Sequence, residues 1–471
     1  MIYLFTKREE DPSRATQTKF VVPAPDGLQF MPCQRAAIEY AVKRDVVLLA
    51  DEMGIGKSAE AIGVSNALPE IQKVLIICPA TLKGMWEREW QRWDVKKLSV
   101  GIVKKVIPTT NVVIVNYDIL RKFRCELRNI AWDLLIADEA HYLVNKKAIR
   151  TREVLGGIKR DAQKVIIDRV KPIYAHKRLF LTGTPILSRP KDIWPLLQIL
   201  DPDGLGSNWH AFAKRYCELF ELQKYNPVTK KMEHLGWKWD GASNLSELQS
   251  EMRKRFMVRR LKCEVLKELP PKRRQIILLE GDKKLGKLIE AEKLEYHKWA
   301  KSDEDLDIPF GEMSKIREEI GLAKVPFVVD YLKDALNETE KIVVFARHHS
   351  TIDKLAAAFA GRVVILDGRT SIDDRQRSVD AFQQDPNVNL FIGSIKAAGV
   401  GITLVAANVC VFAELEYTPA DINQSEDRLH RKGQISPVNI YHLILRGSLD
   451  EHMLNIILKK QAIVSEALDG N

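Results

Sequence analysis

The segment Val46-Val-Leu-Leu-Ala-Asp-Glu-Met-Gly-Ile-Gly-Lys-Ser58 determines the fold class of this chain. An apolar, β-branched run leads into a turn with two glycines and ends in Lys57 and Ser58. A strand, a glycine-rich turn and a helix in this order point backbone N–H groups at phosphate oxygens. The lysine then supplies positive charge to the β- and γ-phosphates, and the serine hydroxyl binds Mg²⁺. The segment therefore predicts an α/β fold with a site for ATP.

Asp51 stands where the full phosphate-binding pattern has its first glycine, so a simple glycine turn before a helix is the alternative interpretation. If the site is real, the whole turn contacts the nucleotide. The residues expected to bind ATP here are Asp51, Glu52, Met53, Gly54, Ile55, Gly56, Lys57 and Ser58.

A second segment is expected to bring two carboxylates to the same end of the sheet. The buried-strand pattern of residues 132–137 is followed by Asp138-Glu-Ala-His141. Open α/β sheets bind their ligands at the carboxyl ends of strands. We therefore expect Asp138 to hold Mg²⁺ through its hydration shell and Glu139 to orient and deprotonate the attacking water. An Asp-Glu pair is more often a solvated surface, but its position after an apolar strand favours the catalytic site.

Short apolar runs recur along the chain in two sets, as in parallel sheets that are covered on both faces. The first set is 46–50, 74–78, 112–115, 134–137 and 178–181, and the second is 342–345, 363–366, 390–392, 409–412 and 440–443. The pattern between them is helical, aromatic and charged. We predict an N-terminal segment 1–27, a first lobe 28–204, a helical connector 205–275, a helical insertion 276–340, a second lobe 341–455 and a C-terminal helix 456–471.

The second lobe carries an arginine segment that suits phosphoryl transfer. Residues 424–434 include Arg428 and Arg431, which helical spacing would place on one face. An arginine at the γ-phosphate accelerates such reactions by roughly 10³- to 10⁵-fold. This catalytic role requires the two lobes to close on ATP, so that nucleotide state sets lobe separation. A surface helix in which the arginines pair with Glu426 and Asp427 is the alternative.

Composition limits the partners of the chain. No apolar run among its 471 residues reaches the roughly 18 residues of a membrane span, and the six cysteines form no C-x-x-C pair. We expect a cytoplasmic protein without a membrane partner, a zinc site or a disulfide framework. The net charge of +10 favours an anionic partner such as nucleic acid. A phosphate track that ignores base sequence is predicted from Lys83, Arg189, Arg347, Lys396 and the basic residues Arg259, Arg260, Lys262, Lys272 and Arg273, with solvated surface charges as the alternative.

Taken in order, these segments resemble the Swi/Snf-like DNA translocases of helicase superfamily two. The resemblance also rests on segments 30–34, 77–86, 115–117, 181–185, 343–349, 366–368 and 394–401. It implies two RecA-like lobes in tandem with inserted helical elements. Segments 183–190, 210–217 and 258–262 resemble the HARP-like annealing-helicase branch. Because only about thirty residues precede Gln34, we expect no substrate-recognition module there, and the compact chain resembles bacterial or phage versions.

The resemblance also implies roles for individual residues. Gln34 is expected to recognise adenine and Gly399 to contact ATP. Residues expected to couple nucleotide state to movement are His141, Thr182, Gly183, Thr184, Gln424 and Gln434. Further residues expected to contact DNA are Asn116, Tyr117, His348, Asp367, Gly368 and Ser394.

Three functions are consistent with these patterns. The first is a DNA-dependent ATPase that needs ATP and Mg²⁺, moves on duplex or branched DNA as a single chain, and reanneals or remodels it. The second is a strand-separating DNA or RNA helicase. The third is an ATP-gated DNA-binding scaffold that hardly turns over.

Overall fold

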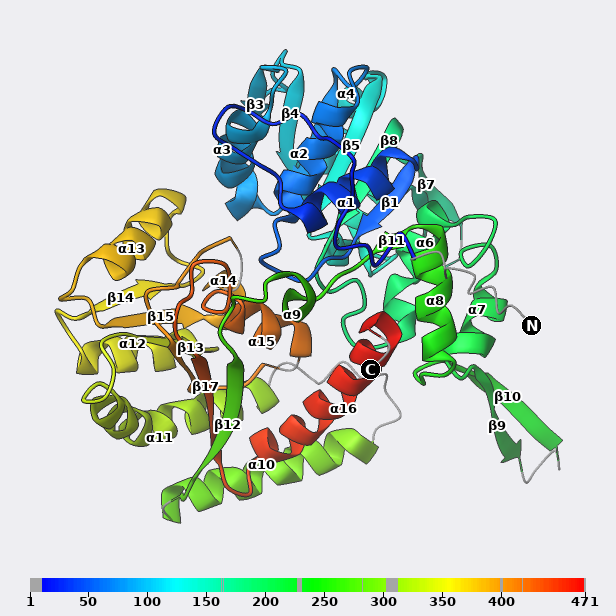
Figure 1. The fold of residues 1–471 in the computed structure, drawn as a ribbon. Coiled ribbons are helices and arrows are strands. Elements are labelled where there is room, and N and C mark those ends of the chain that lie inside the picture. Colours follow the sequence, from blue (N-terminus) through cyan, green and yellow to red (C-terminus); the bar gives the residue numbers. More distant parts are fainter. Residues whose placement is uncertain are drawn as a thin grey trace, which may run out of the picture. The chain divides into compact units, whose positions relative to one another are not determined.

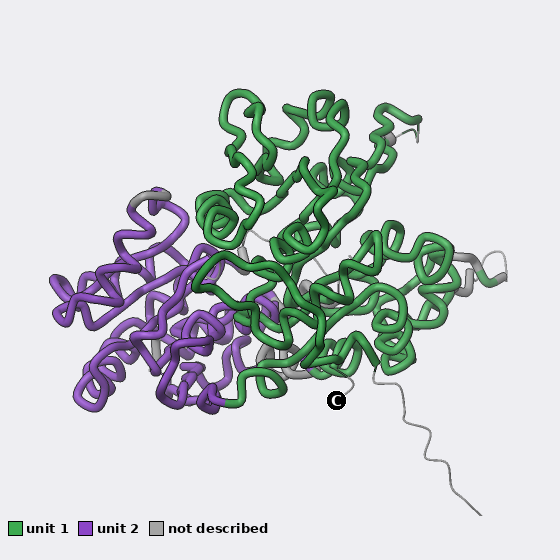
Figure 2. The backbone as a smooth tube through the Cα atoms, turned by 45° about the horizontal axis from the view of Figure 1, so that its top comes forward, with its two compact units in different colours: residues 1–267, 462–471 green, residues 268–461 purple. Residues whose placement is uncertain are grey.

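The chain divides into two compact units, unit 1 with residues 1–267 and 462–471 and unit 2 with residues 268–461 (Figure 2). The computed structural model describes residues 11–161, 163, 165–226, 231–281, 283–301, 312–398, 401–416 and 418–469. Each unit is built around its own parallel sheet.

The sheet of unit 1 has seven strands in the order β11-β1-β8-β5-β2-β4-β3, and every pair is parallel. The strands are β1 (Val46–Leu49), β2 (Val74–Cys78), β3 (Val100–Ile102), β4 (Val112–Asn116), β5 (Trp132–Asp138), β8 (Ala175–Leu181) and β11 (Met257–Val258). The apolar runs that predicted the first set of strands are confirmed. β2 and β4 are buried along their whole length, which explains why they contain no polar alternation.

Unit 1 also contains helices (Figure 1). They are α1 (Pro32–Val42), α2 (Lys57–Ala67), α3 (Lys83–Trp93), α4 (Arg124–Asn129), α5 (Ile149–Leu155), α6 (Trp194–Leu200), α7 (Trp209–Tyr216), α8 (Leu245–Arg255) and α9 (Lys262–Val265). Short 3₁₀ turns cover Ala80–Leu82, Tyr117–Phe123, Ala140–Leu143 and Pro190–Ile193. On α3, Trp86 and Trp90 have no exposed surface, so both side chains pack in the interior of unit 1. The Trp86 indole also contacts Asp138, as described below.

The prediction that residues 205–275 are helical is wrong in part. An antiparallel hairpin of β9 (Phe220–Asn226) and β10 (Lys231–Lys238) follows α7, and β11 and the start of β12 (Lys272–Leu279) also lie in this range. A second hairpin, β6 (Gly157–Arg160) with β7 (Ile166–Val170), precedes β8. These strands are short, charged or exposed, so they lack the apolar runs that identify buried strands.

The sheet of unit 2 has six parallel strands in the order β12-β17-β16-β13-β15-β14. Besides β12 they are β13 (Ile342–Ala346), β14 (Val363–Leu366), β15 (Leu390–Ser394), β16 (Val409–Phe412) and β17 (Val438–Leu445). Along β13 alternate residues enter two different apolar clusters, Val343 and Phe345 on one face and Ile342 and Val344 on the other. Both faces are therefore covered, and the second set of predicted strands is confirmed.

The helices of unit 2 are α10 (Lys283–Lys301), α11 (Glu312–Ala335), α12 (His349–Ala358), α13 (Ile372–Gln384), α14 (Ile395–Ala398), α15 (Pro419–Glu426) and the first part of α16 (Leu449–Asp469). The last helix therefore begins earlier than the predicted start at residue 456. Its final residues, Ala467 and Leu468, belong to the apolar core of unit 1. Within the described ranges, no helix is both long and apolar enough to cross a membrane.

Candidate active site

The turn after β1 forms the phosphate-binding end of unit 1. Gly56 precedes α2 with φ of +106°, and a side chain there would collide with the amide of Gln34, so the position requires glycine. Gln34 Nε2 donates a hydrogen bond to the Ile55 carbonyl oxygen at 2.9 Å, and Lys57 Nζ donates to the Asp51 carbonyl oxygen at 2.7 Å. The predicted turn and the residue expected to recognise adenine thus lie together at the N-terminus of α2.

The other predicted residues of this turn hold its shape. Gly54 also has a positive φ, of +89°. Ile55 is buried, and the Glu52 carboxylate accepts a hydrogen bond from the Lys262 backbone N–H at 2.7 Å. Ser58 lies in the first turn of α2, directly after Lys57.

Asp138 lies at the carboxyl end of β5 with two hydrogen-bond donors on its carboxylate. The Trp86 indole donates to one oxygen at 2.7 Å, and the Glu139 backbone N–H donates to the other at 2.9 Å. Burial, followed by the charge of Glu139, raises the pKa of Asp138 to about 7. A divalent cation would offset this unfavourable concentration of negative charge, so the donor set fits Mg²⁺.

Glu139 and the turn after β8 are connected through a histidine. Glu139 has φ of +51°, a left-handed conformation that is uncommon outside glycine, and its carboxylate lies 3.1 Å from His141 Nδ1. His141 Nδ1 also lies 3.1 Å from Thr182 Oγ1, which accepts the Thr184 backbone N–H at 3.1 Å. The predicted catalytic and coupling residues of unit 1 therefore form one continuous polar chain.

Gly183 brings this turn against the phosphate-binding turn. A Cβ on Gly183 would lie 2.8 Å from Met53 Cγ and 3.4 Å from Lys57 Nζ. The first distance is shorter than real Cβ contacts allow, so only glycine permits the two turns to approach this closely. The ends of β1, β5 and β8 thus converge on one site.

The Asp51 side chain is buried in a cluster that sequence analysis missed. Asp51, Arg260 and Glu60 have no exposed side-chain surface. Asp51 Oδ1 accepts the Arg260 backbone N–H at 2.8 Å and Nε at 3.1 Å, and Arg260 Nη2 lies 3.4 Å from Glu60 Oε1. Burial, followed by Asp51, raises the pKa of Glu60 well above its ordinary value, which favours its neutral form. Asp51, at the position of the first glycine of the pattern, thus anchors the phosphate-binding turn to the interior of unit 1.

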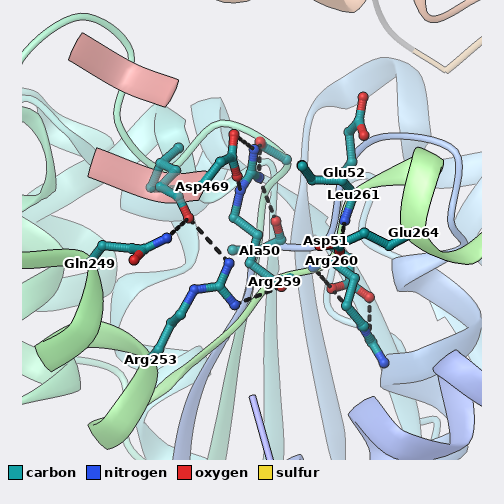
Figure 3. A network of polar contacts seen from close by, with 12 residues as sticks. Ala50, Asp51, Glu52, Gln249, Arg253, Arg259, Arg260, Leu261, Glu264 and Asp469 are labelled. Carbon is teal, nitrogen blue, oxygen red and sulfur yellow. Dashed lines mark hydrogen bonds and ion pairs between the residues drawn. The ribbon is translucent and has the colours of Figure 1, made fainter. Parts of the chain in front are cut away.

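Two residues predicted to contact DNA, Arg259 and Arg260, are interior residues of unit 1 (Figure 3). Arg259 is 6% exposed and pairs with Asp469 at 2.5 Å, while Arg260 pairs with Asp51. The prediction of a DNA-binding role is wrong for both side chains, because each guanidinium is enclosed and already neutralised by a carboxylate.

The arginine segment of unit 2 follows α15 and is not helical throughout. α15 ends at Glu426, and residues 427–433 form turns, so the prediction that helical spacing aligns Arg428 and Arg431 is wrong. Arg428 Nε donates to the Gln424 carbonyl oxygen at 3.1 Å, and Arg431 Nη1 donates to the Ile402 carbonyl oxygen at 3.1 Å. Gln434 is buried and donates to the Ala407 carbonyl oxygen at 2.9 Å. Gly399 lies outside the described residues.

A second buried ion cluster lies beneath this segment and was also missed. Glu426 has no exposed side-chain surface and contacts Lys272 Nζ at 2.9 Å and Arg274 Nη2 at 2.6 Å. Lys272 also contacts Asp427 at 3.0 Å. The basic residues come from β12, whose parallel pairing with β17 no local sequence signal revealed.

The remaining DNA-contact predictions fall into buried and accessible groups. Tyr117 is 3% exposed and donates its hydroxyl to the Asp138 carbonyl oxygen at 2.7 Å, so a DNA contact by this side chain is wrong. Asn116, Asp367 and Ser394 are also buried. Arg347 and His348 are half-buried and pair with Glu416 at 2.9 Å and Glu414 at 2.7 Å. The predicted residues that retain accessible surface and no such ion pair are Lys83, Arg189, Arg273, Gly368 and Lys396, whereas Lys262 is buried.

Comparison with known proteins gives matches along most of the chain. A model of the SNF2-related domain matches residues 33–305, and a model of the helicase conserved C-terminal domain matches residues 323–433. The human (Homo sapiens) DNA annealing helicase and endonuclease ZRANB3 is 32% identical over 466 residues, covering 95% of this chain and 41% of the relative. The Xenopus tropicalis SWI/SNF-related matrix-associated actin-dependent regulator of chromatin subfamily A-like protein 1 is 30% identical over 460 residues, covering 94% and 45%.

The chain thus spans less than half the length of these two relatives. A solved structure of the Sulfolobus solfataricus SWI2/SNF2 ATPase core in complex with dsDNA covers 96% of each chain at 21% identity, with a TM-score of 0.44. The two domain matches confirm the expected resemblance to the Swi/Snf-like family of helicase superfamily two and the two RecA-like lobes in tandem. Because the SNF2-related model alone matches more than half of its residues, the chain belongs to the SNF2-related family.

Proposed function

We propose that the chain is a DNA-dependent ATPase that moves on duplex or branched DNA and reanneals or remodels it. The observation that carries this proposal is the convergence of Lys57, Glu139 and Thr182 at the carboxyl ends of β1, β5 and β8, three neighbouring strands of unit 1. Ligands of open α/β sheets bind at that edge.

The residues of unit 1 fit ATP and Mg²⁺. The N-terminus of α2 presents backbone N–H groups to phosphate, and Lys57 adds a positive charge beside them. Ser58 and Asp138 would hold the Mg²⁺ ion, directly and through its water shell. The ion supplies positive charge that neutralises the phosphates during transfer.

Glu139 is the proposed general base. Its left-handed backbone places the carboxylate beside His141, 3.1 Å from Nδ1, and His141 is held in turn by Thr182. A base whose orientation is fixed by a second group can accept the proton of an attacking water without a reorganisation cost. We propose that Arg428 and Arg431 stabilise the charge that develops on the γ-phosphate, as arginines do in related reactions.

DNA is the proposed partner because a chain with a net charge of +10 attracts a polyanion. Lys83, Arg189, Gly368 and Lys396 are the proposed contacts, since backbone phosphates are bound without sequence recognition. Annealing is proposed because it is named for the ZRANB3 relative.

The test is steady-state ATP hydrolysis with duplex, forked and single-stranded DNA and with RNA. We expect duplex or forked DNA to stimulate hydrolysis by the wild type. Glu139→Gln should lower kcat by about 10²- to 10⁴-fold while ATP binding persists, and Arg431→Ala by about 10²-fold or more. The matched control is Glu126→Gln, an exposed carboxylate of the same unit, which should leave kcat unchanged.

Three outcomes separate the alternatives. Stimulation by RNA alone refutes the DNA motor. Displacement of a strand from a tailed duplex favours the strand-separating helicase. ATP and DNA binding with no turnover favours the scaffold.

A further inference from the structure

Arg259 joins three segments of unit 1 that are far apart in the sequence (Figure 3). Its Nε and Nη2 atoms contact the two carboxylate oxygens of Asp469 at 2.5 and 3.2 Å. Its Nη1 atom donates to the carbonyl oxygens of Ala50 at 2.8 Å and Gly183 at 2.9 Å. One guanidinium therefore connects the end of α16 with the residue before the phosphate-binding turn and with the turn after β8.

Only arginine can make this junction. A guanidinium presents five N–H donors in a fixed plane, so one edge binds a carboxylate with two bonds while the far nitrogen points elsewhere. A lysine ammonium is a compact charge on a flexible stem and cannot hold the same three partners in a fixed arrangement. The Arg259 side chain is 7% exposed and the Asp469 side chain 12%, so water competes little for these contacts.

The end of α16 is itself firmly held in unit 1. Ala467 and Leu468 have no exposed surface and belong to its apolar core. The Leu468 carbonyl oxygen accepts hydrogen bonds from Gln249 Nε2 at 3.1 Å and from Arg253 Nη2 at 3.2 Å. Arg253 Nη1 also donates to the Arg259 carbonyl oxygen at 2.7 Å. Asp469 is thus presented to Arg259 from a fixed support.

The two carbonyl groups bound by Arg259 flank the proposed catalytic groups. Ala50 immediately precedes the turn that carries Lys57. Gly183 packs against Met53 and Lys57, and the adjacent Thr182 contacts His141. A displacement of the Gly183 turn would therefore move the partner of His141 and the surroundings of the lysine together.

We infer that Asp469 is a positioning residue for ATP hydrolysis, which acts through Arg259 on the turns that begin at Ala50 and Thr182. The inference rests on the proposed function. It assigns a site role to the last turn of α16, whose Asp469 is linked to those turns through Arg259. A misplacement of catalytic groups by about 1 Å can cost about 10²-fold in rate, so loss of this indirect support should have a smaller but measurable effect.

The test compares Asp469→Asn, Asp469→Glu and the wild type in the full chain. The matched control is Glu466→Gln, which makes the same chemical change on the exposed side of the same helix. We expect Asp469→Asn to lower kcat about tenfold with KM for ATP changed less than about twofold, since the substrate-binding turn keeps its own contacts. Asp469→Glu keeps the negative charge and should recover most of the wild-type kcat.

Hydrogen exchange of the peptide that contains residues 182–186 provides a measurement independent of hydrolysis. In Asp469→Asn its amides should exchange at least about threefold faster than in the wild type and in Glu466→Gln. If the wild type hydrolyses no ATP, the proposed function fails, and this exchange measurement alone still decides whether Asp469 holds the turn.

The inference is overturned by any of three results. One is a kcat for Asp469→Asn equal to that of Glu466→Gln. Another is unchanged exchange of the 182–186 peptide, even if the melting temperature falls. The third is an Asp469→Asn chain that does not fold, which would make the pair a requirement of the fold and not of the site.

Discussion

The ion cluster beneath the phosphate-binding turn of unit 1 and the ion cluster beneath the arginine segment of unit 2 have opposite charge arrangements. In unit 1 the centre is a cation, Arg260, between Asp51 and Glu60. In unit 2 the centre is an anion, Glu426, between Lys272 and Arg274. In each cluster, basic residues at one edge of the sheet anchor the functional segment of the same unit. These residues follow β11 in unit 1 and lie on β12 in unit 2.

The two clusters differ in how far water can replace a lost partner. All three members in unit 1 have no exposed side-chain surface. In unit 2 Glu426 is equally buried, but the side chain of Lys272 is 15% exposed and that of Arg274 41%. A buried charge that loses its partner is costly because it has no access to solvent, whereas a partly exposed charge can be hydrated again. The comparison therefore predicts that removal of the central charge lowers the stability of unit 1 more than that of unit 2.

The largest effect is expected for Arg260→Met. This variant leaves Asp51 buried without its cation, which should lower the free energy of unfolding by about 3–5 kcal/mol. Denaturant unfolding followed by tryptophan fluorescence measures it, because eight of the nine tryptophans lie in unit 1. Arg92→Met, whose side chain is 60% exposed, is the matched control and should change the unfolding free energy by less than about 0.5 kcal/mol. Equal losses in the two variants would contradict the anchoring role of Arg260.

Glu426→Gln is expected to have an intermediate effect. The amide keeps the shape of the side chain and one hydrogen-bond acceptor, and the two cations retain partial solvent access. The free energy of unfolding should therefore fall by about 1–3 kcal/mol. Hydrogen exchange of peptides from β12, β17 and α15 measures the local stability of unit 2. Glu340→Gln, an exposed carboxylate of the same unit, is the control. A loss of stability as large as that in Arg260→Met would show that the solvent exposure of the partner charges does not determine the destabilisation.

Much of the fold, and the site residues at the carboxyl ends of the strands, could be predicted because their sequence signals are local. A buried parallel strand appears as a continuous apolar run, and the residues at its carboxyl end follow it directly in the sequence. This is why β1, β5 and β8 and the residues Lys57, Asp138 and Thr182 were found together. The turn glycines at 54 and 56 likewise mark positive φ values.

The ion clusters could not be predicted because their partners are distant in the sequence. Arg260 and Asp51 are 209 residues apart, and Arg274 and Glu426 are 152 apart. A run of basic residues without its partners is therefore indistinguishable from a surface track for phosphates. In addition, β12 is an edge strand whose first residues are charged, and this conceals its apolar second half.

The pH dependence of unit 2 sharpens the comparison. Burial alone would raise the pKa of Glu426, but Lys272 and Arg274 outweigh it and hold the pKa below its ordinary value. A carboxyl of this kind stabilises the fold above its unfolded pKa of about 4.3, and the stabilisation disappears as pH falls through the lower folded value. The charged and titratable groups around it are Lys272 and Arg274 on β12, Asp427 beyond α15, His442 on β17 and Cys410 on β16.

The expected measurement is the difference in stability between wild type and Glu426→Gln from pH 6 to pH 3. The difference should be constant near pH 6 and shrink in acid, with a slope of at most about 1.4 kcal/mol per pH unit for one proton. Glu340→Gln should show no such trend. A difference that grows as pH falls would mean that Glu426 is protonated in the folded chain, contrary to its pairing with two cations.

The smallest effect is expected for Arg274→Gln, which removes one of the two cations of the Glu426 cluster. Lys272 still contacts Glu426 at 2.9 Å, so the buried carboxylate keeps a partner. Arg274 is partly hydrated in the folded chain, and pairs of this exposure contribute about 0–1 kcal/mol. Hydrogen exchange of the β12 and β17 peptides should therefore change less than in Glu426→Gln. If Arg274→Gln were as damaging as Arg260→Met, the number of cations, and not solvent access to the lost charge, would govern how both functional segments are anchored.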